Sequence, residues 1–454
     1  MHGTIPYKLV RRHPRACAIA GLAVSVSLSG AIGACGSDSS PSSTEDAGSI
    51  VIQRPDGDTA ANSRPVISAG AKHVCAIGNA GTLRCWGSNK KGELGNPMAQ
   101  DLADGGYTFD DQPVGLPMSA SVGAVARVAS GSGVDYNSTC AVLTNGQVQC
   151  WGDDGAGALG RGDTSASAAS RPHPEAMAVV GMPSSESVAT NSTFSCAVSL
   201  GRVRCWGHNA QHTMWTSTGA DGTFRSPVDI ALPEQHTATQ LALGQEHACV
   251  VLDDARVACW GNNGSGQLGV AVTTTPISQP GIVPSLNGVA EVAGGELTTC
   301  VRMVAGQVQC FGSNEYGLLG REVDQTALAS DAQPAAVHLP PGSVVTQLAM
   351  GYTHACALLS DGSVWCWGVN YYGELGSGQI DGTSGTFQPR TSGTPLKVQG
   401  LPTTAVQVSA GNEFTCAVLL DNSVMCWGDD FWGDLGQGTP GGSAPHPVPA
   451  KVKF

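Results

Sequence analysis

Cysteine is the residue type whose spacing most clearly points to chemistry in this sequence of 454 residues. The chain has 16 cysteines, of which Cys17 and Cys35 lie near the N-terminus and the others form seven pairs. The members of a pair stand ten positions apart, except in the third pair, where they stand nine apart. Such pairs could form disulfides, bind zinc or remain as buried thiols. The pairs are Cys75 and Cys85, Cys140 and Cys150, Cys196 and Cys205, Cys249 and Cys259, Cys300 and Cys310, Cys356 and Cys366, and Cys416 and Cys426.

A short turn inside each pair sets the register of the strands that carry the cysteines. In the sixth pair the turn is Ser360-Asp361-Gly362, where Gly362 supplies the left-handed conformation that closes such a loop. Counting outward from this turn places Cys356 directly opposite Cys366, in the closer, non-hydrogen-bonded kind of pair. This register favours a disulfide across the two strands of the hairpin.

The third pair checks this register, because its turn is one residue shorter. With Leu200-Gly201 as a two-residue turn, Cys196 still lies opposite Cys205. Zinc sites usually pair cysteines roughly two to four residues apart, with both pairs converging on one ion, and a pair repeated once per unit does not converge. We therefore predict seven disulfides, with free buried thiols as the remaining alternative, and no metal or cofactor.

The cysteine pairs recur about every 57 residues, which is the signature of a repeat architecture. In one unit, segments 345–350, 351–359 and 363–367 are strand-like, and a fourth strand-like segment follows at 395–398. No sustained helical periodicity is present beyond the first 34 residues. We expect an all-β fold over residues 65–454: a seven-bladed β-propeller of four-stranded antiparallel blades, with one disulfide inside each blade.

Two further motifs accompany the cysteines. Cys-Trp-Gly begins at positions 85, 150, 205, 259, 366 and 426, and Gly-x-Leu-Gly begins at 92, 157, 266, 317, 373 and 433. On these motifs the chain resembles the regulator of chromosome condensation repeat family, over about residues 66–454. The third unit departs from the pattern because it lacks Gly-x-Leu-Gly, and the fifth has Phe311 in place of Trp. The resemblance implies a seven-bladed propeller.

The first 34 residues read as a lipoprotein-type signal peptide. Lys8, Arg11, Arg12 and Arg15 form a positive region, and an apolar, small-residue stretch follows and ends in Ile32-Gly33-Ala34-Cys35. This ending resembles a bacterial lipobox, which implies lipidation of Cys35, and residues 35–64 read as a flexible Ser-rich tether. We expect a lipid-anchored protein of the bacterial cell envelope, at the outer membrane or cell surface, or a secreted protein if Cys35 is not lipidated.

The charge balance bears on the partner. The formal net charge is −13, and residues 1–34 contribute four basic and no acidic side chains. Such a surface repels phosphate backbones, so we expect no nucleic acid partner and no membrane contact beyond the lipid anchor. We expect a monomer that binds a protein or a glycan at the envelope.

One pair of positions in each unit varies strongly. An Asn or Asp two residues after each Trp-Gly or Phe-Gly is expected to accept backbone N–H bonds in a tight loop, and the two residues after it differ from blade to blade. In the last three units they include aromatic side chains, which are typical binding anchors. Because these units are neighbours in a propeller, we predict one ligand-binding patch, with loop packing as the alternative. Its residues are Tyr316, Tyr371, Tyr372, Phe431 and Trp432.

Several other polar residues have simpler interpretations. His73, His247 and His354 share one repeat position, and each is expected to form a hydrogen bond within its own blade. The doublets Asp153-Asp154 and Asp429-Asp430 read as turn residues, with calcium binding as the alternative.

These observations favour a non-enzymatic binding protein that presents its loops to a protein or glycan. The repeats also resemble secreted bacterial propellers that inhibit β-lactamases, which makes an inhibitor-like role one form of this hypothesis. Two alternatives stay open. One is guanine-nucleotide exchange, the activity of the family's eukaryotic namesake, although paired cysteines and an export signal argue against the cytosol. The other is an enzyme acting on envelope polysaccharide, which would need clustered acids or a His/Tyr pair at the funnel.

Overall fold

The two central strands of every blade form the hairpin that carries a cysteine pair. The computed structural model describes residues 66–95, 99–101, 107–109, 112–117, 122–133, 137–162, 172–209, 222–321, 330–380, 391–438 and 442–454. In the sixth hairpin Cys356 faces Cys366, and in the third Cys196 faces Cys205 across the shorter turn. All seven pairs are disulfides within their own blades, with Cα atoms 4.0–4.1 Å apart. The predicted pairing is confirmed.

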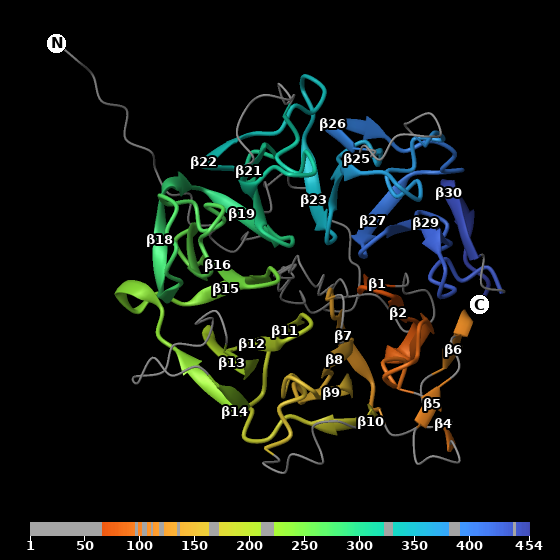
Figure 1. The fold of residues 1–454 in the computed structure, drawn as a ribbon, viewed down its shortest axis with the longest axis horizontal. Helices are drawn as coiled ribbons and strands as arrows, with labels where there is room; N and C mark the ends of the chain where they lie inside the picture. The colour runs from red at the N-terminus through yellow and green to blue at the C-terminus, as the bar shows by residue number, and fades with distance from the viewer. Residues whose placement is uncertain are drawn as a thin grey trace, which may run out of the picture. The chain divides into compact units, whose positions relative to one another are not determined.

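Seven four-stranded antiparallel sheets are arranged around a common centre (Figure 1). The first three blades are β1 (Val66–Ala69), β2 (His73–Ile77), β3 (Leu83–Gly87) and β6 (Gln112–Pro117); β7 (Val125–Ser130), β8 (Ser138–Leu143), β9 (Val148–Asp153) and β10 (Pro172–Ala178); and β11 (Ser187–Thr190), β12 (Phe194–Ser199), β13 (Arg202–His208) and β14 (Thr223–Ile230). The fourth and fifth are β15 (Ala238–Leu243), β16 (His247–Leu252), β17 (Arg256–Gly261) and β18 (Ile277–Asn287); and β19 (Val289–Gly294), β20 (Thr298–Met303), β21 (Val308–Ser313) and β22 (Ser330–Ala336). The last two are β23 (Val345–Met350), β24 (His354–Leu359), β25 (Val364–Val369) and β26 (Thr391–Lys397); and β27 (Ala405–Ala410), β28 (Phe414–Leu419), β29 (Val424–Asp430) and β30 (Gly442–Lys451).

Three short elements stand outside this plan. A small hairpin of β4 (Ala99–Asp101) and β5 (Tyr107–Phe109) is inserted between the third and fourth strands of blade one, and sequence analysis did not anticipate it. Two single-turn 3₁₀ helices, η1 (Asn79–Gly81) and η2 (Pro233–Gln235), lie in connections. In the described part of the chain, no helix has the length and apolar character needed to cross a bilayer.

Burial follows the position of a strand within its blade. All six residues of β8, β24 and β28 are buried, because both faces of a central strand pack against neighbouring blades. The outer strand β26 is largely half-exposed. This difference explains why the cysteine strands read as nearly continuous apolar runs, whereas the outer strands are rich in Pro, Ser and Thr.

In five blades the Trp of the Cys-Trp-Gly motif joins its blade to the Gly-x-Leu-Gly loop of the blade before it. Its indole N–H donates to the backbone carbonyl of the variable residue in that loop. Five such bonds of 2.7–2.9 Å lie in the described part of the chain: Trp86 to Asp434, Trp151 to Glu93, Trp206 to Ala158, Trp367 to Leu318 and Trp427 to Glu374. The two repeat motifs are therefore the two halves of one contact between blades.

A hydroxyl group just before the first cysteine reinforces this contact in some blades. Thr415 donates to the same Glu374 carbonyl as Trp427, at 2.9 Å. Blade five has Phe311 instead of Trp, and there Thr299 donates to the carbonyl of Gln267 at 2.8 Å. The loop carbonyl thus keeps a buried donor where the indole is absent.

The histidines at the shared repeat position also form hydrogen bonds between blades. His73 Nε2 lies 2.8 Å from the hydroxyl of Thr139 in the next blade, and that hydroxyl donates to the carbonyl of Glu93. The imidazole must therefore be the donor in the first of these bonds. His247 and His354 contact Thr299 and Thr415 in the same way, each at 2.8 Å. The prediction of a bond within the blade was wrong, because the partner comes from a strand about 50–65 residues away.

The ring closes without exchanging a strand between its ends. Gln407 of β27 binds both backbone groups of Ile67 in β1: its Oε1 accepts from the N–H at 3.2 Å, and its Nε2 donates to the carbonyl at 2.8 Å. Figure 1 shows β1 beside β27 at the centre of the ring. The same clamp joins Gln347 to Val408 and Gln240 to Val292. The closing seam therefore uses the same contacts as internal seams.

The Trp contact leads to a paired prediction. Trp367→Phe removes the donor to the Leu318 carbonyl, and residue 355 is Ala, so no hydroxyl replaces it. Trp427→Phe leaves the Glu374 carbonyl bonded to Thr415. An unsatisfied buried acceptor costs about 1–3 kcal/mol, so Trp367→Phe should lower the free energy of unfolding by about 1–2 kcal/mol more than Trp427→Phe. Urea unfolding of the oxidised protein measures both, and equal losses would contradict this account of the seam.

Candidate functional site

The loop after the third strand of a blade is held in shape by its own Asn or Asp. Asn370 Oδ1 accepts the backbone N–H of Leu375 at 3.1 Å, and Asp430 Oδ1 accepts that of Leu435 at 2.9 Å. The same bond occurs in four other blades. Gly373 follows at a φ of 88°, where a Cβ would lie 2.4 Å from Pro447. The loop frame is thus fixed, and the side chains between the Asn or Asp and this glycine are left to vary.

Three of the five predicted aromatic residues line one cavity of about 440 Å³. They are Tyr316, Tyr371 and Trp432, which come from blades five, six and seven. Tyr372 and Phe431 occupy neighbouring loop positions but are not part of the wall. Tyr371 is 45% exposed, whereas Tyr316 is half-buried and packs against the hydrophobic core. The two interpretations of these residues therefore separate: Tyr316 contributes to loop packing, and Tyr371 is available to a ligand.

The rest of the wall comes from residues that sequence analysis did not select. Tyr352 and Glu413 lie in the loops between the first and second strands of blades six and seven, and Lys72 lies in the same loop of blade one. Asp429, at the end of β29, was interpreted as a turn residue, with calcium binding as the alternative. These inner loops also vary from blade to blade, so their variability was the available signal. Only the closed ring brings these inner loops, which join the first and second strands, close to the loops that follow the third strands.

Burial changes the electrostatics of these acids. Burial raises the pKa of Glu413, and the nearby charge of Asp429 raises it further, whereas Lys72 lowers it. Burial likewise raises the pKa of Asp429, with Asp430 adding to the effect. The inner loop of blade five is also acidic. Its Glu296 accepts a hydrogen bond of 2.7 Å from the Tyr352 hydroxyl. Burial and the charges of Glu315 and Glu246 raise the pKa of Glu296.

The protein's own lysines surround Trp432. Lys90 Nζ lies 3.5 Å from the centre of the indole ring, and Lys72 Nζ lies 5.7 Å from it. Phe431 packs edge-on against the same side chain, with ring centres 4.6 Å apart. Trp432 therefore sits at the seam between blade seven and blade one, in cation–π contact with the latter.

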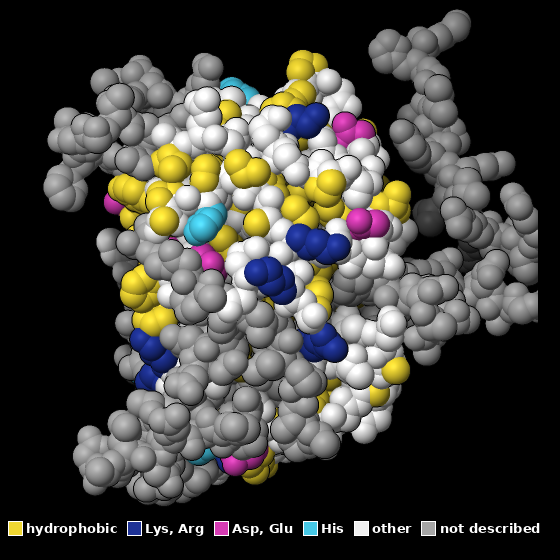
Figure 2. Space-filling view, turned by 90° about the vertical axis from the view of Figure 1, so that its right-hand side faces the viewer, with side chains coloured by type: hydrophobic (Ala, Val, Ile, Leu, Met, Phe, Trp, Pro, Cys, Tyr) yellow, Lys and Arg dark blue, Asp and Glu magenta, His cyan; other side chains and the backbone are white. Residues whose placement is uncertain are grey.

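The side of the ring that Figure 2 shows has a different character. This view faces the outer edge of the ring near β30 and β6, and hydrophobic side chains there are scattered among neutral polar groups. Lys, Arg, Asp and Glu appear as isolated residues on its described part rather than as one charged field.

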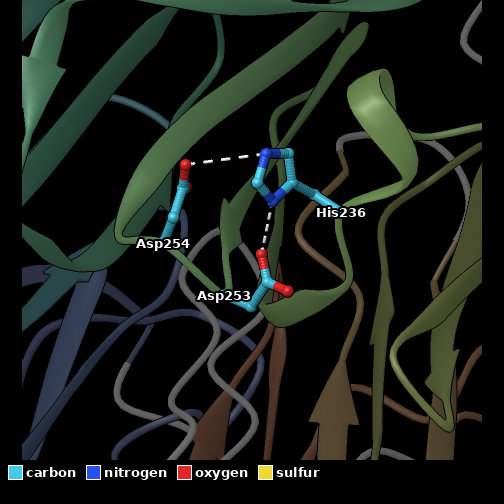
Figure 3. A group of neighbouring side chains, drawn as sticks. All are labelled: His236, Asp253 and Asp254. Carbon is cyan, nitrogen blue, oxygen red and sulfur yellow. Dashed lines mark hydrogen bonds and ion pairs between the residues drawn. The ribbon is translucent and has the colours of Figure 1, made fainter.

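Two groups of acidic residues elsewhere do not form a cation site. His236, Asp253 and Asp254 lie close together, but Asp253 contacts Nδ1 at 2.6 Å while Asp254 faces Nε2 at 3.6 Å (Figure 3). The two carboxylates thus approach different ring nitrogens, and Arg256 also contacts Nε2, at 2.7 Å. One ion cannot gather these ligands without displacing that guanidinium.

The Asp153-Asp154 doublet is likewise already paired. Lys91 Nζ lies 2.8 Å from Asp153, and Arg225 Nη1 lies 3.2 Å from Asp154. Asp154 also serves as the loop residue that accepts the N–H of Leu159. These contacts fit the turn interpretation.

Comparison with known proteins agrees with the repeat pattern and the ring. The RCC1-like domain matches residues 110–454, and a regulator of chromosome condensation repeat matches residues 67–93. The chain belongs to the RCC1-like domain family. It is 29% identical over 377 residues to the ultraviolet-B receptor UVR8 of Arabidopsis thaliana, covering 82% of this chain and 78% of that one.

Two further relatives show how far the likeness extends. The regulator of chromosome condensation of Mus musculus is 30% identical over 215 residues, which is 47% of each chain. Among solved structures, Prp20p of Saccharomyces cerevisiae superposes with a TM-score of 0.68 at 21% identity, covering 85% of this chain and 86% of that one. This structural likeness supports the fold.

The buried carboxyl of Glu374 allows a pH test of the loop beside the cavity. Its Oε2 accepts the N–H of Tyr372 at 2.8 Å, and burial raises its pKa to about 7 from an ordinary 4.5. A carboxyl whose pKa is higher in the folded chain stabilises the fold at low pH, and this stabilisation is lost as pH rises through about 7. Gln267 stands at the same position of blade four and accepts a backbone N–H through its amide oxygen.

We therefore expect Glu374→Gln to raise the free energy of unfolding at pH 8 by about 1–3 kcal/mol and to change it little at pH 4. Glu93→Gln is the matched control, because both oxygens of Glu93 accept hydrogen bonds and the neutral amide should bring no gain at pH 8. Urea unfolding at the two pH values measures the difference. A pH-independent effect of Glu374→Gln would show that folding does not raise the pKa of this carboxyl.

Proposed function

We propose that this protein is a non-enzymatic binding protein of the bacterial cell envelope that holds a partner against its loop aromatics. The observation that carries the proposal is a cavity whose wall includes Tyr316, Tyr371 and Trp432 from three successive blades. A rigid ring with exposed aromatic side chains on fixed loops loses little conformational entropy on binding. An inhibitor of a secreted enzyme is one form of such a role.

A protein partner is favoured over a glycan. The yeast relative Prp20p is described by its binding to Gsp1p and histones, so a propeller of this family can hold proteins. The family relationship also raises guanine-nucleotide exchange, but seven disulfides suit an oxidising compartment, whereas small GTPases act in the reducing cytosol. We favour the envelope.

A second candidate function has one observation in its favour. Glu413 and Asp429 are clustered acids beside aromatic side chains at the mouth of the ring, as a polysaccharide-cleaving enzyme would need. Release of reducing ends from host envelope polysaccharide, abolished by Glu413→Gln, would support it. If no reducing ends are released, the binding role remains the proposed function.

The binding role predicts a separation between affinity and stability. Truncating a buried aromatic anchor at an interface typically costs about 2 kcal/mol or more, roughly thirtyfold in affinity. Tyr371→Ala and Trp432→Ala should each weaken affinity capture of the partner from envelope extract by at least that factor. Tyr371→Ala, at an exposed position, should change the free energy of unfolding by no more than about 0.5 kcal/mol.

Tyr316→Ala provides the contrast, since its ring packs against the core and its loss should lower the melting temperature. Normal capture by the Tyr371 and Trp432 variants, together with early melting of both, would mean that these aromatics serve only to pack the loops.

The envelope anchor is a separate part of the proposal, because residues 1–65 lie outside those that the structure describes. Lipidation of Cys35 predicts a mature chain that begins with diacylglyceryl-cysteine. Mass spectrometry of the N-terminal peptide from the native host detects this group. An unmodified N-terminus at another residue would exclude anchoring while leaving a secreted binding protein.

A further inference from the structure

The aromatic cavity is also acidic. Its wall combines the rings of Tyr352, Tyr371 and Trp432 with three acidic residues, Glu413, Asp429 and Asp434, and one basic residue, Lys72. A backbone hydrogen bond of 2.8 Å from Asp429 N–H to the Glu413 carbonyl holds these two acidic residues side by side. Aromatic faces and carboxylates both attract cations, whereas an anionic ligand would meet repulsion from both acids.

Asp429 has a hydrogen-bonding capacity that the protein does not use. Its side chain lines the cavity and the residue is only 6% exposed, yet its Oδ1 receives no hydrogen bond from any described residue. A buried carboxylate oxygen without a donor is costly, and native structures rarely keep one without a reason. A ligand that brings N–H donors into the cavity would satisfy it.

Trp432 already makes cation–π contacts with two lysines of the same chain, which shows that its ring face can hold an ammonium group. Lys90 and Lys72 of blade one place their Nζ atoms 3.5 and 5.7 Å from the centre of its ring. These lysines come from loops of the same chain, so a partner's cation would enter on the side of the cavity lined by Glu413, Asp429 and Tyr371.

The acidity extends beyond one pocket. Glu296 accepts a hydrogen bond from the hydroxyl of Tyr352, which lines the cavity. The charge of Glu246, in the neighbouring blade, raises the pKa of Glu296. Glu413, Glu296 and Glu246 therefore lie in the inner loops of blades seven, five and four, and Tyr352 lies in that of blade six. A single small cation would use only the cavity, whereas an extended chain with several positive charges would use these inner loops as well.

We infer that the cavity binds a lysine or arginine side chain of a basic segment of a partner protein, with neighbouring basic residues of that segment lying along Glu296 and Glu246. This inference rests on the proposed binding function and names the chemistry of the partner. Tyr372 and Phe431, which lie beside the cavity wall, offer surface to the residues that flank the inserted side chain.

The test uses the full-length protein with its disulfides intact and a fluorescein-labelled dodecapeptide of alternating lysine and glycine. Fluorescence anisotropy at low salt should show saturable binding that weakens as salt is added, and a glutamate–glycine peptide should not bind. Glu413→Gln combined with Asp429→Asn should weaken binding of the lysine peptide at least tenfold. Trp432→Leu should also weaken it.

The matched control removes two negative charges away from the cavity. Glu175→Gln combined with Asp229→Asn, on the outer strands β10 and β14, changes the net charge equally and should alter affinity by less than twofold. Equal losses in both double variants would overturn the inference, because the attraction would then be general. Binding of choline or free lysine as tightly as the peptide would overturn the assignment to a basic segment.

The failure of this inference can be told apart from the failure of the proposed function. If Tyr371→Ala weakens capture of the natural partner but the Glu413 and Asp429 double variant does not, the binding role stands and the cationic partner is wrong. If neither affects capture, the proposed binding face itself is wrong.

Discussion

The bond from an indole N–H to a loop carbonyl of the preceding blade is the contact on which this propeller depends. It joins a third-strand Trp to the Gly-x-Leu-Gly loop, so the loop that presents variable side chains is also part of the seam between blades. Both partners are buried, and a buried carbonyl without a donor is costly. The loop therefore cannot shift without disturbing the next blade, which gives the variable side chains a rigid base.

This constraint explains where variation is allowed. The loop backbone is bonded at its Asn or Asp, at its glycines and at the carbonyl that meets the Trp, as in the loop from Asn370 to Gly376. The two residues between the Asn or Asp and the first glycine carry none of these motif contacts through their side chains. The propeller separates residues that hold the ring from residues that meet a ligand, although Tyr316 shows that one of the latter can still pack on the core.

Sequence reasoning succeeded where the determining contacts are local. The opposition of Cys356 and Cys366 follows from the length of a turn three residues long, and the same counting holds in the third blade with its shorter turn. The loop role of Asn370 depends on a residue five positions away. The partner of His73 is 66 positions away, and the cavity joins residues from blade one to blades five, six and seven, so neither follows from local spacing. The closing seam was equally out of reach, because Gln407 and Ile67 are 340 positions apart.

The histidines show how the repeats differ while the ring stays regular. Burial lowers the pKa of His73 to about 3 and that of His354 to about 4, so both are neutral at physiological pH and can donate through Nε2 to a hydroxyl. A charged imidazole in the same place would need a carboxylate partner. Each His faces a Thr in the next blade, and the blades that carry His have Val or Ala at their own hydroxyl position. Neighbouring blades are therefore complementary rather than identical. Exchanging blades five and six would place His247 opposite Ala355 and leave a buried donor unpaired, so hydrogen bonding between blades restricts the order of the repeats.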